Sequence, residues 1–186
     1  QIAGKTHTFG KVNLAGMLRE LVGASDGASR FRRHLQLNDR WGEAMVRAGY
    51  GDATHVFSML GEGGPYSCEA NRRGLTVVSE VYILLATERI MKMERHAFPE
   101  WEPTATDYDA VRMQYQRKDP LLDFSHFFIC PSEAVQDDLV INCHVMRDRT
   151  ALVPYGMNSR WLNLEPQPQP GRVLFVGTAD LRKGIH

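Results

Sequence analysis

Short apolar runs alternate with segments of helical periodicity along residues 54–153. The runs are rich in β-branched and aromatic residues, a composition typical of buried β-strands. We expect strands at residues 56–60, 75–79, 127–130 and 151–153. Strands separated by helices usually pair in parallel through right-handed crossovers. The pattern therefore predicts an α/β fold with a Rossmann-like parallel sheet and flanking helices.

Two amphipathic helices are predicted ahead of the first strand. Their apolar positions recur at intervals of three and four residues, so each helix has one apolar face. The first set is Leu14, Leu18, Leu21 and Val22, and the second is Leu37, Trp41, Ala44, Met45 and Ala48. Gly49 is expected to end the second helix in a left-handed conformation.

A βαβ unit is predicted around a glycine-rich turn. Residues 61–65 read Gly-Glu-Gly-Gly-Pro and directly follow the first strand. A short helix over 66–73 comes next, and Gly74 closes it ahead of the second strand.

Three more helices are predicted from spacing and capping residues. The first covers 83–97, and two nearby prolines end it. The second begins at Thr106 and Asp109, which have the spacing of a capping box. The third follows Pro131, with Ser132 as its N-cap.

Composition narrows the classes of function. Of 186 residues, 43% are hydrophobic and 24% are charged, and the formal net charge is zero. No apolar run approaches the roughly 20 residues that a transmembrane helix needs. Zero net charge gives no general attraction to nucleic acid. The densest basic patch, residues 30–34, is interpreted either as a solvated helix start or as a phosphate contact.

The cysteines give no sign of a metal site or of disulfides. Cys68, Cys130 and Cys143 are an odd number, and their spacing matches no zinc-binding pattern. We expect reduced thiols, as in a cytoplasmic protein.

The C-terminal part of the chain has the pattern of a phosphate-binding turn. Residues 165–171 alternate proline with polar residues, which favours a stiff linker. A strand is expected at 172–176, where the apolar run 173–176 follows Arg172 and ends at Gly177, and Lys183 follows on a basic segment. A strand that ends in glycine before a basic helix start commonly binds phosphate, because backbone N–H groups and positive charge converge there.

Three motifs, taken in order, resemble a known family. They are ICPSEAVQDDLV from residue 129, TALVPYGMN from residue 150, and RVLFVGTADLRKG from residue 172. In this combination the chain resembles the middle of a family-4 retaining glycosyltransferase of the two-domain GT-B fold. The likeness covers roughly residues 53–186, and the upstream segment VVSEVYILLATERIMKMERHAFPEWE resembles a subgroup of that family.

The resemblance implies transfer of a sugar from a nucleotide-sugar donor to an acceptor hydroxyl, with retention of configuration. The acceptor would be a saccharide, a lipid-linked compound or a small molecule, and no cofactor or metal would be required. The residues that it assigns to donor binding are Gly177, Thr178, Arg182 and Lys183. Lys183 matches the family's diphosphate-binding lysine. The family often has arginine where Thr178 stands, so that cation is either missing or supplied by Arg182.

Other residues at predicted strand ends and helix starts are expected to line the cleft between the two domains. They are Gly61, Gly63, Gly64, Glu80, Tyr82, Ser132, Glu133 and Asn158. Each also has a structural interpretation. The glycines fit a flexible connection, and the others fit helix caps or packing.

The resemblance also predicts the domain organisation. Residues 1–162 would form part of an acceptor-side domain, 163–171 the linker, and 172–186 the first strand and turn of a donor-binding domain. The catalytic residues would then lie outside this chain, and the chain alone is expected to be inactive. The expected location is the cytoplasm, and peripheral membrane contact is an alternative that no segment of this sequence indicates.

Two other functions stay open at this stage. One is a non-catalytic module of the same fold that binds a nucleotide or sugar, and the other is a GT-B sugar-nucleotide epimerase. The family's glutamate pair with a spacing of eight is not expected here. Glu80 with Glu88, and Glu94 with Glu102, have that spacing but lie in the first domain.

Overall fold

A computed structural model describes residues 26–102, 106–116, 120–178 and 180–184. Its centre is a parallel sheet of four strands in the order β1-β2-β3-β4. The strands are β1 (His55–Met59), β2 (Thr76–Glu80), β3 (Phe127–Cys130) and β4 (Thr150–Leu152). The predicted Rossmann-like α/β fold with flanking helices is confirmed, and each strand lies within one residue of its expected bounds. The predicted helix around Leu14 lies outside the described residues.

The register of the sheet keeps alternate residues on one face. Val56 pairs with Val77, and Val78 pairs with Phe127. Because side chains alternate along a strand, one set points toward the helices and the other away from them. Val77 and Phe128 are fully buried, whereas Phe57 on the opposite face is 61% exposed.

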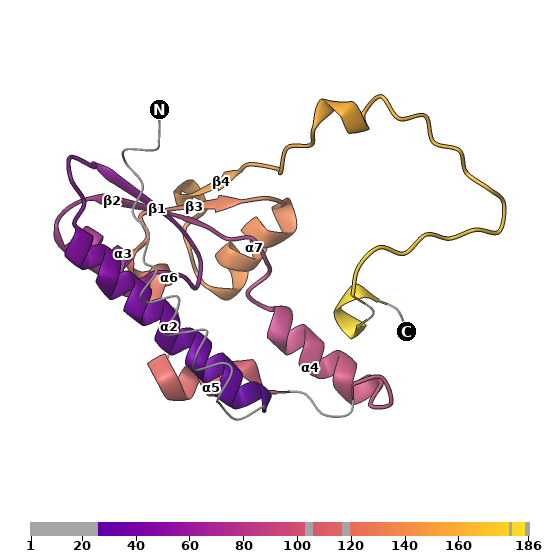
Figure 1. Ribbon diagram of the computed structural model, residues 1–186, viewed down its shortest axis with the longest axis horizontal. Coiled ribbons are helices and arrows are strands. Elements are labelled where there is room, and N and C mark those ends of the chain that lie inside the picture. Colours follow the sequence, from indigo (N-terminus) through magenta and orange to yellow (C-terminus); the bar gives the residue numbers. More distant parts are fainter. Residues whose placement is uncertain (1–25, 103–105, 117–119, 179, 185–186) are drawn as a thin grey trace.

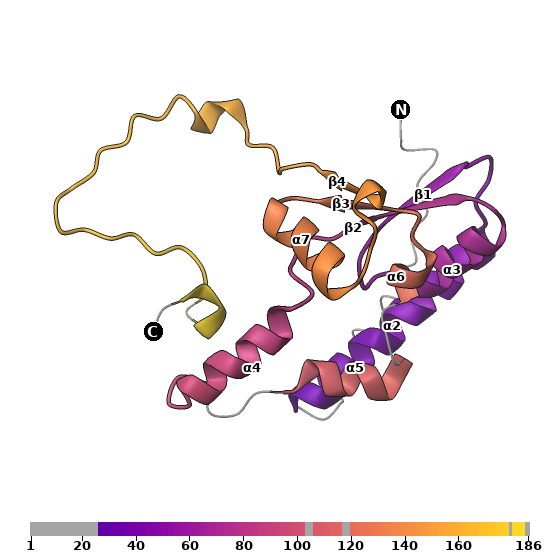
Figure 2. The same ribbon diagram turned by 180° about the vertical axis from the view of Figure 1, so that it is seen from behind.

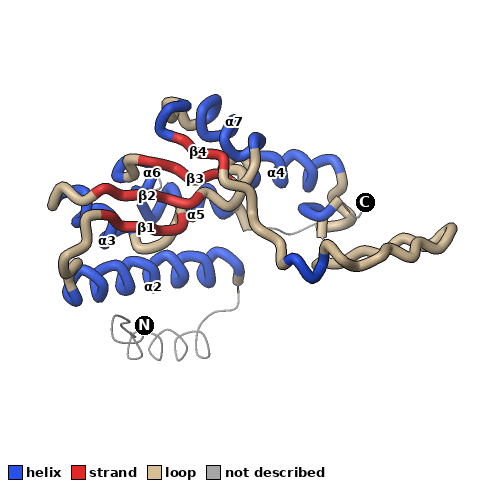
Figure 3. The backbone as a smooth tube through the Cα atoms, turned by 90° about the horizontal axis from the view of Figure 1, so that it is seen from above, coloured by secondary structure: helices blue, strands red, loops and turns tan. Residues whose placement is uncertain are grey.

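Helices pack on one side of the sheet, as Figures 1 and 2 show. The α-helices are α2 (Gly27–Ala48), α3 (Gly64–Arg72), α4 (Thr87–Ala97), α5 (Tyr108–Gln116), α6 (Pro120–Phe124) and α7 (Glu133–Asn142). Figure 3 shows the strands from the other side, where no described helix lies across them. None of the described helices has the length and apolar character required to cross a bilayer.

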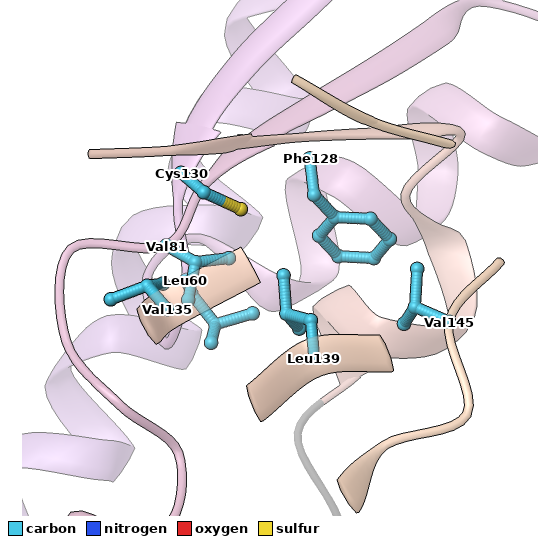
Figure 4. Close-up of a cluster of buried hydrophobic side chains, with 7 residues drawn as sticks. All are labelled: Leu60, Val81, Phe128, Cys130, Val135, Leu139 and Val145. Atoms are coloured by element: carbon cyan, nitrogen blue, oxygen red, sulfur yellow. The ribbon is translucent and has the colours of Figure 1, made fainter. Parts of the chain in front are cut away.

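The main core lies between the sheet and α7. It comprises Leu60, Val81, Phe128, Cys130, Val135, Leu139 and Val145, drawn in Figure 4. A second cluster joins Val56, Ala70 and Val77 beneath β1 and β2. Both clusters include strand residues that face the helices. They hold the sheet against the helices and so position the carboxyl ends of the strands.

Several predicted turns and caps are confirmed. Gly49 ends α2 as predicted, and its N–H donates to the carbonyl of Met45 over 3.0 Å. Its φ of 86° is positive, but its ψ of −177° is not that of the expected left-handed helical conformation. Gly74 follows α3 with a φ of 78°. The Ser132 hydroxyl accepts from the Val135 N–H at the start of α7.

The expected start of the helix at residue 83 was wrong, because α4 begins at Thr87. Leu84 and Leu85 instead pack against the main core cluster. The turn that places them is held by the carboxylate of Asp138, which accepts from the Ala86 N–H over 3.0 Å. Tertiary packing therefore overrides the helical spacing of Ile83 and the residues after it.

Two other details differ from expectation. Asp107 caps α5, accepting from the Ala110 N–H over 2.9 Å, in place of the predicted Thr106. Asp107 lies one residue closer to the first turn, so its carboxylate reaches that N–H group. Residues 172–176 form no strand, because they have no sheet partner among the described residues, and Val173 is 97% exposed.

Candidate functional site

A cavity of about 420 Å³ opens at the carboxyl ends of β1 and β2. Leu60 and Gly61 follow β1, and Tyr82 follows β2, so both strand ends contribute to the wall. The carboxyl edge of a parallel sheet is where α/β proteins generally bind their ligands. The volume of the cavity is within the range of small-molecule sites, roughly 300–1,000 Å³.

The opposite wall comes from α2 and α5, which pack against each other. Phe31 of α2 meets Tyr108 of α5 edge to face, with ring centroids 5.0 Å apart. The guanidinium of Arg112 lies 5.5 Å from the centre of the Phe31 ring. These contacts give the cavity an aromatic side with a cation beside it.

Asn38 connects α2 to the turn after β1. Its side chain is buried, and Nδ2 donates to the Gly61 carbonyl over 3.2 Å. The same Nδ2 lies 3.3 Å from Nε2 of His34, one turn earlier on the helix. An Nε2 that accepts this bond carries no proton, so a neutral His34 has its proton on Nδ1. Asn38 therefore positions both a cavity histidine and a cavity glycine.

Among the described residues around the cavity, carboxylates outnumber arginine and lysine. Its lining includes Glu62, Glu88 and Asp109, and among the residues that the structure describes Arg112 is the one arginine or lysine there. Glu88 also forms an ion pair with Arg95, which lies outside the lining, at 3.0 Å. The local charge therefore does not favour an anionic ligand in the cavity.

Glu80 lies at the carboxyl end of β2 and binds a residue that follows β4. The Tyr155 hydroxyl donates to Oε1 of Glu80 over 3.0 Å. Desolvation and this hydrogen bond to the carboxylate raise the pKa of Tyr155. The contact ties the segment after β4 to the carboxyl end of β2, two residues before the cavity residue Tyr82.

The structure separates the sequence-predicted cleft residues into two groups. Gly61 and Tyr82 line the cavity, and the remaining candidates are not among its lining residues. Gly63 has a left-handed conformation before α3, which begins at Gly64. Ser132 and Glu133 form the start of α7, and Asn158 caps a short 3-10 helix. The structural interpretation of Ser132 as a cap is confirmed.

The predicted donor-binding residues lie on the C-terminal segment, beside α4 (Figures 1 and 2). Gly177 and Lys183 are brought together, since a Cβ on Gly177 would lie 3.9 Å from Cε of Lys183. Thr178, Arg182 and Lys183 are exposed, and none of them lines the cavity. Lys183 is the last residue of a 3-10 helix, η4 (Leu181–Lys183).

Glu102 attaches this segment to the rest of the protein. Its Oε1 accepts from the Leu181 N–H over 3.0 Å, and the Leu181 side chain is only 3% exposed. Arg95 donates to Oε2 of Glu102 over 3.2 Å. The hydrogen bond from Leu181 is the main factor that lowers the pKa of Glu102, and Arg95 adds to it.

The cysteines are free thiols, as expected. Burial raises the pKa of Cys130 and of Cys143, which favours the protonated form. Within the described part of the chain, no group of three or more His, Cys, Asp or Glu side chains could hold a metal ion.

Sequence reasoning missed most of the cavity wall. The interpretation of residues 30–34 as a solvated helix start or a phosphate contact does not include a cavity wall, although Phe31 and His34 lie on the cavity side of α2. The four-residue spacing of His34 and Asn38 was the available signal, because such residues share a helix face.

Comparisons with protein-family models, with curated proteins and with solved structures found no match. A functional assignment therefore rests on the motifs and on the geometry of the site.

Proposed function

We propose that this chain is part of a retaining glycosyltransferase that transfers a sugar from a nucleotide-sugar donor to an acceptor hydroxyl. In this proposal the sheet and its cavity belong to the acceptor side. The segment from residue 172 onward belongs to the donor side, and the two together form one site in a longer protein. The nucleotide sugar is a substrate, and the transfer needs no metal.

The observation that carries the proposal is the position of the family-like motifs at the carboxyl edge of a parallel sheet. The Pro-Ser-Glu motif starts α7 directly after β3, and the Val-Pro-Tyr-Gly motif directly follows β4. The cavity opens at the same edge, after β1 and β2. Groups that bind substrates in open α/β sheets gather at this edge.

The chemistry requires positive charge where the nucleoside diphosphate leaves. Negative charge accumulates on the diphosphate as the bond to the sugar breaks, and preorganised cations and N–H donors stabilise it. Lys183 lies next to Gly177, whose φ of 152° is one that residues with a side chain rarely adopt. Lys183 would bind the diphosphate, and Arg182 or Thr178 would supply a second contact.

The test measures nucleoside diphosphate binding by a longer protein that contains this sequence. Lys183→Ala should weaken binding of the preferred uridine, guanosine or adenosine diphosphate by about 1.5–3 kcal/mol, the range for a charge-assisted hydrogen bond. Arg182→Ala is the comparison variant at the neighbouring cation, and its effect should be smaller unless Arg182 supplies the second contact. If Arg182 does replace the family's arginine, Thr178→Arg should restore the affinity lost in Arg182→Ala. Unchanged affinity in Lys183→Ala would contradict the proposed role of Lys183.

A further inference from the structure

The floor of the cavity consists of apolar core residues. Leu60 belongs to the main hydrophobic cluster and is 6% exposed. Leu84, Leu85 and Leu122 also line the cavity and pack against the same cluster. A ligand that reaches the floor therefore contacts aliphatic side chains. A free sugar would lose hydrogen bonds to water there without replacing them.

Aromatic rings continue the apolar surface toward the mouth. Phe31 and Tyr108 form one side through their edge-to-face contact, and Tyr82, which is 48% exposed, also lines the cavity. Aromatic side chains bury large areas of flat apolar ligands. The shape and surface therefore suit a compound with an aromatic or other apolar body.

Polar groups lie among the lining residues and include His34, whose side chain is exposed. A neutral His34 whose Nε2 accepts from Asn38 has an Nδ1–H that can donate to a ligand hydroxyl. Among the described lining residues, the carboxylates of Glu62 and Asp109 outnumber the single cation of Arg112 even with Glu88 paired to Arg95, which disfavours a phosphate or carboxylate on the ligand. The polar end of a matching ligand should therefore accept this Nδ1–H and carry no negative charge, and a hydroxyl group meets both requirements.

We propose that the cavity binds a neutral amphipathic hydroxyl compound with an apolar or aromatic body. If the proposed glycosyltransferase function is right, this compound is the sugar acceptor. The inference thus goes beyond that function by excluding free saccharides and anionic lipids from this cavity.

The experiment uses three probes with the 186-residue chain: 2-naphthol, 2-naphthyl phosphate and methyl α-glucoside. Naphthyl fluorescence reports binding of the first two, and calorimetry reports binding of the glucoside. We expect 2-naphthol to bind at least about tenfold more tightly than its phosphate ester, and the glucoside to show no binding. Equal or tighter binding of the phosphate or the glucoside, or no binding of 2-naphthol, would overturn the inference.

A matched pair of phenylalanine substitutions locates the binding site. Phe31→Ala should weaken 2-naphthol binding by about tenfold, because an aromatic wall is lost. Phe57→Ala should leave the affinity unchanged, since Phe57 lies on the face of the sheet away from the helices and outside the cavity lining. An equal loss in both variants would overturn the assignment to this cavity.

Glu62→Lys provides a second variant that does not depend on the packing of α2. Glu62 is exposed and lines the cavity, so a lysine there changes the charge with little cost to the fold. It should increase the affinity for 2-naphthyl phosphate several-fold and leave that for 2-naphthol unchanged. No gain for the phosphate would contradict the electrostatic argument.

Failure of this inference and failure of the proposed function give different results. Lys183→Ala should not alter 2-naphthol binding, because Lys183 does not line the cavity. If the longer protein binds 2-naphthol tightly but binds no nucleoside diphosphate, the glycosyltransferase function is rejected. The proposed class of cavity ligand then stands. The reverse combination would reject the ligand class alone.

Discussion

The cavity and the segment from residue 172 to 184 both carry candidate residues, but different contacts hold them in place. The cavity floor is shared with the main hydrophobic core, and the Asn38 side chain fixes one wall. The C-terminal segment is exposed from Val173 to Thr178. The contacts that hold it to α4 and to the turn after α4 include the buried Leu181 side chain and a hydrogen bond to Glu102. The packing of the sheet and its helices therefore holds the cavity residues in place, whereas fewer contacts hold the proposed donor-binding turn.

The largest expected difference between the two regions is in their response to loss of an aliphatic side chain. Leu139→Ala should lower the free energy of unfolding by about 2–5 kcal/mol, because Leu139 is fully buried in the main core. Leu174→Ala should change it by less than about 0.5 kcal/mol, since Leu174 is 87% exposed. Urea denaturation followed by circular dichroism measures both variants. Similar losses would mean that the C-terminal segment is packed in solution.

A second comparison concerns two asparagines. Asn38→Ala should lower the free energy of unfolding by about 1–3 kcal/mol. The Gly61 carbonyl loses the donor that the buried Asn38 side chain provides. Asn158→Ala, the matched control in the segment after β4, should cost about 1 kcal/mol or less, because its cap is exposed. The same denaturation experiment applies. A larger loss at Asn158 would reverse the comparison.

The sequence was sufficient to predict the sheet because the strands are short apolar runs bounded by turn residues. Phe127–Cys130 was located correctly from its apolar residues, and the apolar run 151–153 located β4, Thr150–Leu152, to within one residue. Ser132 caps α7 as predicted. The cap of α5 is Asp107 and not the predicted Thr106 beside it. Local rules thus predicted most element boundaries to within a few residues.

The cavity could not be predicted in the same way, because its walls meet only through tertiary packing. Phe31 and Tyr108 are far apart in the sequence, and no periodic pattern indicates that α2 and α5 pack together. The turn that brings Leu84 onto the core depends on the side chain of Asp138, a residue of α7. Gly61 and Tyr82 were predicted because both directly follow strands, which is a local feature.

Acidification provides a third test, specific to the C-terminal segment. The folded protein lowers the pKa of Glu102 from a reference value of 4.5. The stabilisation that the ionised Glu102 gives to the folded state is therefore complete at pH values above the reference value. It is lost as the pH falls through the lowered folded pKa. Hydrogen exchange at the Leu181 amide, measured by NMR and corrected for intrinsic rates, should show less protection at low pH.

Glu102→Gln is the control for that measurement. The variant cannot ionise, so Leu181 protection should be reduced by about fivefold at neutral pH and should not fall further because of residue 102 on acidification. The backbone of β2, taken as an internal reference within the sheet, should keep its protection over the same range. Identical pH profiles in the two proteins would exclude Glu102 as the group that holds the segment.

The smallest expected effect on stability comes from Val173, which is 97% exposed. Val173→Lys should change the free energy of unfolding by less than about 0.5 kcal/mol and should reduce aggregation, since a charge interrupts an exposed apolar run. Light scattering during storage measures aggregation, with Val173→Leu as the uncharged control. Equal aggregation of both variants would show that the exposed residues 172–176 do not drive aggregation.

The central claim is that the cavity and the Gly177–Lys183 turn serve one sugar-transfer reaction. The most direct measurement incubates a longer protein containing this sequence with nucleotide sugars and 2-naphthol, and then determines the product's anomeric configuration by NMR. The account predicts a naphthyl glycoside with the same configuration as the donor, formed more slowly by both Phe31→Ala and Lys183→Ala. No product from any donor, or a product with inverted configuration, would contradict it.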